Sequence, residues 1–179
     1  YGFPSNNFAI ASNPQAAEYA YIGGKMHAVL TVDHVSTSGR DTSLGAYAAV
    51  IGQIHARTNE PLKIFYRKLP NHEYGSIFWT YETNARKETG NYEHRTDIKH
   101  DVFGAYNLTK ASNAPADGVK LGELISYDVD VQGDVMHLTF KKGLGTEAEV
   151  VKTFDINLAE GKYQGNQYDE GYANEGDYM

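Results

Sequence analysis

The stretch VIGQIHART (residues 50–58) starts as an apolar strand and carries two polar residues, Gln53 and His55, two positions apart. In a β-strand this spacing places both side chains on one face, while Gly52 and Ile54 point to the other. An amide donates hydrogen bonds to a carboxylate, and an imidazole takes up a proton near neutral pH. The stretch therefore predicts a strand whose polar face binds a carboxylate and moves a proton. The alternative is a hydrogen-bonded histidine on an ordinary sheet.

A basic and aromatic segment, LKIFYRKL (residues 62–69), comes after a short loop. So short a connection predicts that the two strands are antiparallel neighbours. Alternation places Lys63 and Arg67 on one face and Tyr66 and Lys68 on the other, so these four side chains cannot all line one cleft. Lys63 and Arg67 are candidates for binding carboxylates, although basic residues on an open sheet face often serve only solvation.

Alternation of apolar and polar residues continues through most of the chain. It is clear at residues 25–35, 74–81, 123–131 and 136–140 and again within 146–156, and Gln132-Gly133-Asp134 is typical of a hairpin turn. No segment has a sustained helical stripe of apolar residues with caps at both ends. Many short strands separated by turns predict an all-β fold, a sandwich or jelly roll, without internal repeats.

Two segments interrupt this pattern. Residues 1–24 are rich in Asn, Ser, Ala and Pro, which predicts a loop with at most one edge strand. Residues 83–91 are highly charged and contain Gly90, which predicts a solvated excursion. The wider stretch 83–100 resembles an insertion, and we hypothesise that it forms a wall beside the candidate site.

Composition limits the possible partners and cofactors. A chain of 179 residues and 19.8 kDa is long enough for one domain with a substantial core. The net charge of −7 argues against nucleic acid or an anionic membrane as partner, and an anionic substrate would need a local basic patch. The absence of cysteine excludes disulfides and thiol catalysis, and none of the seven histidines has the HxH or HExxH spacing of a zinc site.

An extended set of motifs resembles the alginate lyases of polysaccharide lyase families seven and eighteen. The segment IGQIHA (residues 51–56) matches their Q-I-H motif, and NEPLKIFYRKLP (residues 59–70) is very close to the segment next to that motif in those enzymes. VDHV (residues 32–35), LGE (residues 121–123) and SYDV (residues 126–129) are also similar. The resemblance runs from about Lys25 to the C-terminus.

The resemblance implies a concanavalin-like β-jelly roll that cleaves alginate, a 1,4-linked uronic acid polymer, by β-elimination without a metal or organic cofactor. By resemblance Gln53 contacts the substrate carboxylate and His55 is the base or assists the base. Lys63 and Arg67 are expected to bind neighbouring carboxylates. The resemblance also implies a secreted or periplasmic protein.

Two family motifs are absent. These are an upstream R-S/T-E-L-R motif with a carboxylate-binding Arg and a downstream Y-F-K-A-G-x-Y-N-Q motif with the acid Tyr. We therefore expect residues 1–179 to form a single catalytic domain that is incomplete at both ends, with segments of the same nicked enzyme as complementing partners. The alternatives are a lyase for another polyuronate such as glucuronan, and a non-catalytic jelly-roll carbohydrate-binding module.

Overall fold

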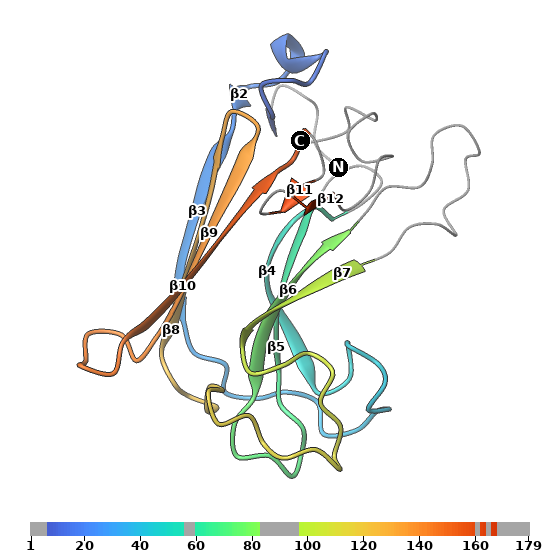
Figure 1. The fold of residues 1–179 in the computed structure, drawn as a ribbon, viewed down its shortest axis with the longest axis vertical. Coiled ribbons are helices and arrows are strands. Elements are labelled where there is room, and N and C mark those ends of the chain that lie inside the picture. The colour runs from blue at the N-terminus through green and yellow to red at the C-terminus, as the bar shows by residue number, and fades with distance from the viewer. Residues whose placement is uncertain (1–6, 56–59, 83–96, 160–161, 164–165, 168–179) are drawn as a thin grey trace.

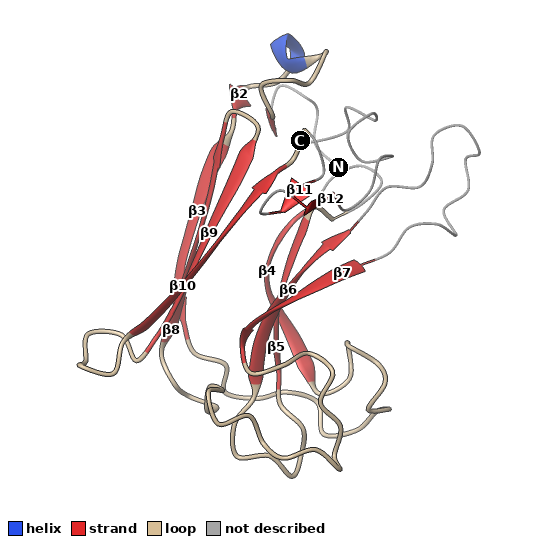
Figure 2. Ribbon diagram, in the orientation of Figure 1, coloured by secondary structure: helices blue, strands red, loops and turns tan. Residues whose placement is uncertain are grey.

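Two antiparallel sheets face each other in this protein (Figures 1 and 2). The structure is a computed structural model that describes residues 7–55, 60–82, 97–159, 162–163 and 166–167. The six-stranded sheet has the order β12 (Asn166–Gln167), β11 (Lys162–Tyr163), β10 (Val150–Asn157), β9 (Val135–Lys142), β8 (Ile125–Gln132), β3 (Gly24–Leu30). The four-stranded sheet has the order β4 (Ala48–Ile54), β5 (Leu62–Arg67), β6 (Ser76–Glu82), β7 (Asp97–Phe103). The predicted all-β jelly-roll sandwich is confirmed.

The N-terminal part contains two short strands, β1 (Phe8–Ala9) and β2 (Tyr21–Ile22), which pair in parallel. Between them lies a 3-10 helix at Ala16–Glu18. Within the described residues, no helix is long and apolar enough to span a membrane.

The core lies between the two sheets and results from the alternation of the strands. The inward-facing residues are large and apolar because every second side chain of each strand points to the opposite sheet. From the four-stranded sheet they include Leu62, Ile64, Tyr66, Ile77, Trp79 and Tyr81, and from the six-stranded sheet Tyr127, Val129, Val131, Met136, Leu138 and Phe140.

The hairpin predicted at residues 132–134 is present. β8 and β9 pair along their whole length, from Ile125 opposite Lys142 to Gln132 opposite Val135. Gly133 has a φ of 59°, a conformation that glycine adopts without steric cost. The turn residue thus allows the two strands to pair in the register that keeps their apolar faces inward.

β7 is a strand that the sequence-based interpretation did not predict. The hypothesis of an inserted wall at residues 83–100 is wrong for residues 97–100, because β7 forms the edge of the four-stranded sheet and pairs with β6. Residues 83–96 lie outside the described residues. The alternation was present in the polar sequence DIKHDVF, where Ile98 and Val102 face the core.

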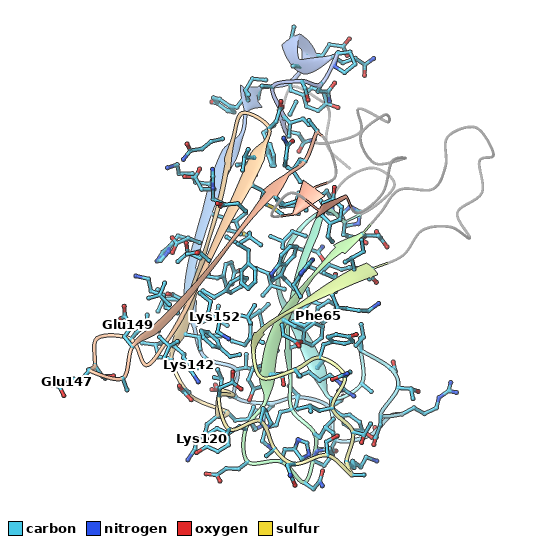
Figure 3. The ribbon with its side chains drawn as sticks, viewed as in Figure 1. Phe65, Lys120, Lys142, Glu147, Glu149 and Lys152 are labelled. Atoms are coloured by element: carbon cyan, nitrogen blue, oxygen red, sulfur yellow. The ribbon has the colours of Figure 1, made fainter. Side chains whose placement is uncertain are left out.

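Lysines of the six-stranded sheet bridge to the other sheet at one end of the sandwich (Figure 3). Lys152 Nζ donates a hydrogen bond to the carbonyl of Val102 in β7. Lys142 Nζ donates to the carbonyl of Asp117, and the ammonium groups of Lys142 and Lys152 lie over the ring of Phe103 at 5.1 and 5.5 Å. These contacts cover the core at this end of the sandwich.

Tyr127 connects the sheets near the QIH segment. Its hydroxyl group crosses from β8 to donate a 2.7 Å hydrogen bond to the carbonyl oxygen of Ile51 in β4. The pairing of β4 with β5 has a β-bulge between Val50 and Gly52. A Cβ atom at Gly52 would lie 2.5 Å from the Tyr127 hydroxyl oxygen, so only glycine fits there. This contact orients Gly52 toward the core and, by alternation, Gln53 away from it.

We predict that Gly52→Ala lowers the free energy of unfolding by about 1–3 kcal/mol, because the added methyl group overpacks the core against Tyr127. Urea unfolding measures this change. Gly45→Ala is the matched control, since a Cβ atom there meets no atom within 4 Å. Equal stability of both variants would contradict the close packing of Gly52 against Tyr127.

Candidate active site

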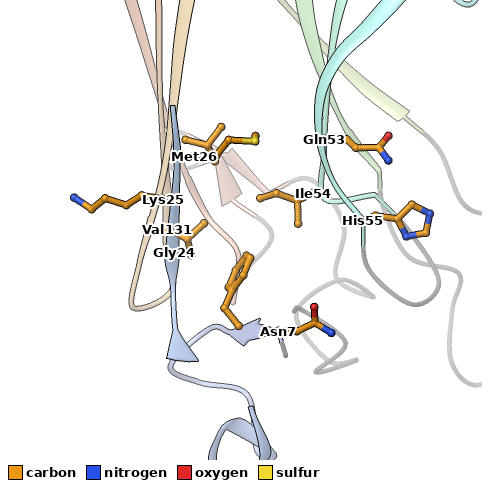
Figure 4. Close-up of a pocket in the computed structure, with 10 residues that line it drawn as sticks. Asn7, Gly24, Lys25, Met26, Gln53, Ile54, His55 and Val131 are labelled. Carbon is orange, nitrogen blue, oxygen red and sulfur yellow. The ribbon is translucent and has the colours of Figure 1, made fainter. Parts of the chain in front are cut away.

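Gln53 and His55 lie on the outer face of the four-stranded sheet, on its edge strand β4 and directly after it. Both are exposed. Figure 4 shows both side chains pointing away from the six-stranded sheet, whereas Ile54 points toward it. The predicted division of faces is therefore confirmed.

A cavity of about 300 Å³ lies on the opposite side of β4, between the two sheets (Figure 4). It is lined mainly by apolar groups, among them Phe8, Met26, Ile54 and Val131. Gln53 and His55 also contribute to its lining, but their polar ends point away from it, so the cavity lies on the core side of β4.

A row of polar residues crosses the outer face of the four-stranded sheet. Gln53 is the register partner of Lys63, Lys63 of Thr80, and Thr80 of Lys99. The row runs from β4 to β7, perpendicular to the strands. Residues in one row have neighbouring side chains, so the sheet brings Gln53 and Lys63 together as the sequence suggested.

Three carboxylates surround Lys63. Its Nζ lies 3.4 Å from Oε2 of Glu60, 3.9 Å from Oε1 of Glu82 and 3.2 Å from Oδ1 of Asp97. The other oxygen of Glu60, Oε1, lies 3.2 Å from Nε2 of His55. We call His55, Glu60, Lys63, Glu82 and Asp97 the charged cluster. In the part of the chain that the structure describes, no group of His, Asp or Glu residues is arranged to hold a metal ion.

The two glutamates of the charged cluster titrate differently. Burial and a hydrogen bond with Glu60 raise the pKa of Glu82 to about 7. Burial disfavours the charge of Glu60, but the hydrogen bond with Glu82 and the charge of Lys63 outweigh it, so the pKa of Glu60 lies below its usual value. Burial opposes the charge of Lys63, yet Asp97 and Glu82 raise its pKa above the ordinary value. At moderately acidic pH the pair thus consists of a neutral Glu82 and an ionised Glu60.

Aromatic rings continue the outer face beside this cluster. Phe65 lies on the side of β5 away from the six-stranded sheet (Figure 3). It stacks on Phe78 with ring centroids 4.9 Å apart, and Tyr106 lies 6.2 Å from Phe78. Phe65 and Phe78 are buried, while Tyr106 is half-buried. The outer face is thus a packed surface on which charged groups occupy one end.

Arg67 has a different environment from Lys63 although the two share a face. Its side chain is buried and donates hydrogen bonds to four backbone carbonyls, those of Asp41, Ala46, Tyr106 and Leu108, at 2.6 to 3.3 Å. The guanidinium group therefore joins two loops to β5. The role of Arg67 in binding substrate stays a prediction. Its hydrogen bonds give it a second role, which is to hold these loops against β5.

The sequence-based interpretation did not include Glu60, Glu82 and Asp97 among the site residues. Glu60 is part of the segment NEPLKIFYRKLP, two residues before the basic strand, and its position in a short loop was the available signal. Glu82 and Asp97 come from β6 and β7, and only the register of the sheet places them beside Lys63.

The fold and the candidate site define a class of protein. It is a jelly-roll sandwich that carries amide, imidazole and ammonium groups on the outer face of one sheet. The chain belongs to the family described as "Alginate lyase", whose model matches residues 1–179. This confirms the resemblance found in the sequence.

Similar proteins of known structure share the fold. An alginate lyase of Klebsiella pneumoniae is 32% identical over 180 residues, which cover 99% of this chain and 53% of the relative. A crystal structure of the alginate lyase from Klebsiella pneumoniae superposes with a TM-score of 0.70 at 31% identity, covering 97% of this chain and 55% of that chain. The exolytic PL7 alginate lyase AlyA5 from Zobellia galactanivorans also has a TM-score of 0.70, at 39% identity, with 77% of this chain and 45% of that chain covered. The chain spans about half the length of these relatives.

We predict that Arg67→Lys lowers the free energy of unfolding by roughly 2–4 kcal/mol, because a lysine cannot satisfy four buried carbonyls with the same geometry. Arg40→Lys is the control, since Arg40 is exposed. Thermal or urea unfolding measures the difference. Unchanged stability combined with weaker polymer binding would favour the substrate-binding role instead.

We also predict that Glu82 makes stability depend on pH. Its pKa is about 7 in the folded protein against 4.5 for the free side chain, so the folded state holds the proton more tightly. This contribution is fully present below pH 4.5 and is lost as the pH rises through about 7. Between about pH 5 and about pH 8 the free energy of unfolding of the unsubstituted protein, measured with urea, should decrease by on the order of 2 kcal/mol relative to that of Glu82→Gln. Burial lowers the pKa of His100 to about 4, so His100 changes stability in the opposite direction over this range, but equally in both proteins. The lowered pKa of Glu60 changes the stability only at pH values below this range. A parallel pH dependence in both proteins would contradict the assignment.

Proposed function

We propose that this chain carries the carboxylate-binding and proton-transfer groups of a lyase that cleaves alginate by β-elimination. The observation that carries the proposal is the placement of Gln53 and His55 side by side on the outer face of β4, in a chain of the alginate lyase family. The relatives named alginate lyase support the choice of polymer.

β-Elimination of a uronic acid polymer begins with removal of the weakly acidic proton at C5. The negative charge that develops spreads onto the adjoining carboxylate, and hydrogen bonds to that carboxylate stabilise it. The amide of Gln53 supplies such a bond, and Lys63 stands next to it in the same row. Removal of the C5 proton needs a base within hydrogen-bond reach. Histidine is a common general base, and His55 is the exposed histidine beside Gln53.

The second half of the reaction breaks the bond between C4 and the glycosidic oxygen. The electron pair left at C5 forms the double bond between C4 and C5, and the departing oxygen takes up a proton. We assign that acid to no residue of this chain, because the Tyr motif of the family is absent from residues 1–179.

The overall charge of −7 does not favour an anionic polymer, so binding depends on the local arrangement of Gln53, His55 and Lys63. We further propose that the protein acts outside the cytoplasm, in the periplasm or medium, because a long polyuronate does not cross a membrane unaided. Fractionation of the native host with an antibody against the chain tests this localisation.

We predict that His55→Ala reduces kcat/KM on alginate by about 10²–10⁴-fold, because proton transfer loses its base. Gln53→Ala should reduce it by about 10²–10³-fold through weaker stabilisation of the developing charge. The assay measures the ultraviolet absorbance of the unsaturated uronate product, using the protein that contains residues 1–179.

His27→Ala is the control, because His27 pairs with Asp128 on the other sheet at 2.6 Å. Undiminished turnover in His55→Ala would contradict the role of His55. Polymer binding without any unsaturated product from the unsubstituted protein would favour a carbohydrate-binding module, and turnover of glucuronan in place of alginate would change the substrate.

A further inference from the structure

We propose that Glu60 is a positioning residue for His55, and that Glu82 and Lys63 hold Glu60 in place. The inference rests on the proposed function, because it concerns the same histidine. Gln53 and His55 carry the proposed chemistry. Glu60, from the loop before β5, is a further residue of the same site.

The contact between Glu60 and His55 involves one defined atom of each side chain. Oε1 of Glu60 lies 3.2 Å from Nε2 of His55, which is hydrogen-bond distance. The negative carboxylate beside Nε2 favours the ring form that carries hydrogen on that nitrogen, because an unprotonated Nε2 would place its lone pair against the carboxylate oxygen. In the neutral ring the lone pair then lies on Nδ1.

Glu60 is itself fixed from two sides. Its second carboxylate oxygen, Oε2, lies 3.4 Å from Nζ of Lys63. Its backbone N–H donates a 2.7 Å hydrogen bond to Oε2 of Glu82, and the N–H of Glu82 donates to the carbonyl of Glu60 at 3.3 Å. Two hydrogen bonds to the backbone and an ion pair to the side chain restrict Glu60 more than a surface ion pair would.

Within the charged cluster, the exposure of the side chains decreases from His55 inward. The side chain of His55 is 40% exposed, that of Glu60 24% and that of Glu82 9%. His55 is thus accessible to a polymer on the sheet face, whereas the groups behind it are shielded. This order is the one expected for a reacting group supported by groups that do not touch the substrate.

Charge gives Glu82 a second influence on the site. Among the described residues, the titratable groups that face it are Glu60 from the loop, Lys63 from β5 and Asp97 from β7, with His55 beyond Glu60. On the same face, Lys99 Nζ donates to the backbone carbonyl of Asp97. With a neutral Glu82, Lys63 balances one of the two remaining carboxylates. Ionisation of Glu82 adds a negative charge near His55, which opposes the approach of a uronate.

The test compares Glu60→Gln and Glu82→Gln with Glu73→Gln in the protein that contains residues 1–179. Glu73 is exposed and pairs with Lys120 at 2.7 Å, so it controls for the loss of a carboxylate elsewhere. Glu60→Gln should reduce kcat about tenfold to a hundredfold and leave KM within about twofold, because orientation of the base is lost while polymer contacts remain. Glu82→Gln keeps an acceptor oxygen for the N–H of Glu60 but cannot ionise, so its KM should be lower than that of the unsubstituted protein above about pH 7.

A spectroscopic measurement separates this inference from the proposed function. Nitrogen-15 NMR of the His55 ring, assigned with His55→Asn, should show hydrogen on Nε2 in the unsubstituted protein. In Glu60→Ala it should show a shift toward the Nδ1–H form. If the ring signals do not move, or if a folded Glu60→Gln keeps full kcat, the inference is overturned. If no unsaturated product forms at all, the proposed function fails, while the NMR result still decides whether Glu60 orients His55.

Discussion

The contact of Tyr127 with Gly52 and Ile51 is the constraint on which the candidate site depends. Tyr127 reaches across the core from β8, and its hydroxyl group holds the backbone of β4 at the bulge. Because side chains alternate along a strand, fixing Gly52 toward the core also fixes Gln53 toward the outer face. A one-residue slip would bury the amide and expose Ile54, so packing in the core determines the chemistry of the opposite face.

Outside the core, the same sheet collects charges that are far apart in the chain. Lys63 meets carboxylates from the loop before β5, from β6 and from β7. Three ionised carboxylates would carry more negative charge than one half-buried ammonium group balances. Glu82 reduces this excess, because it holds a proton more tightly than usual. With Glu82 neutral, the cluster has one ammonium group against two ionised carboxylates, and ionisation of Glu82 adds a third. The local charge, not the net charge, governs what approaches His55.

Arg67 illustrates the difference between a residue's face and its role. Sequence alternation correctly placed it on the same face as Lys63, but four carbonyls surround its guanidinium group. Those carbonyls belong to loops that sequence reasoning could not place beside β5.

In contrast, the hairpin at Gly133 and the antiparallel pairing of β4 with β5 were predictable, since both result from turn residues and short connections. β7 was missed because its outward residues are charged and it lies next to a charged segment.

The sequence by itself determined which residues alternate, where the main hairpin turns, and to which family the chain belongs. These properties are local or depend on motifs, so they can be read along the chain without knowledge of contacts. Only the tertiary structure decided that Glu60 lies against His55, that Glu82 and Asp97 lie against Lys63, and that Arg67 is enclosed by loops. The physical reason is that strand register and loop packing bring together groups that are distant in sequence, and the pKa of each group depends on those neighbours.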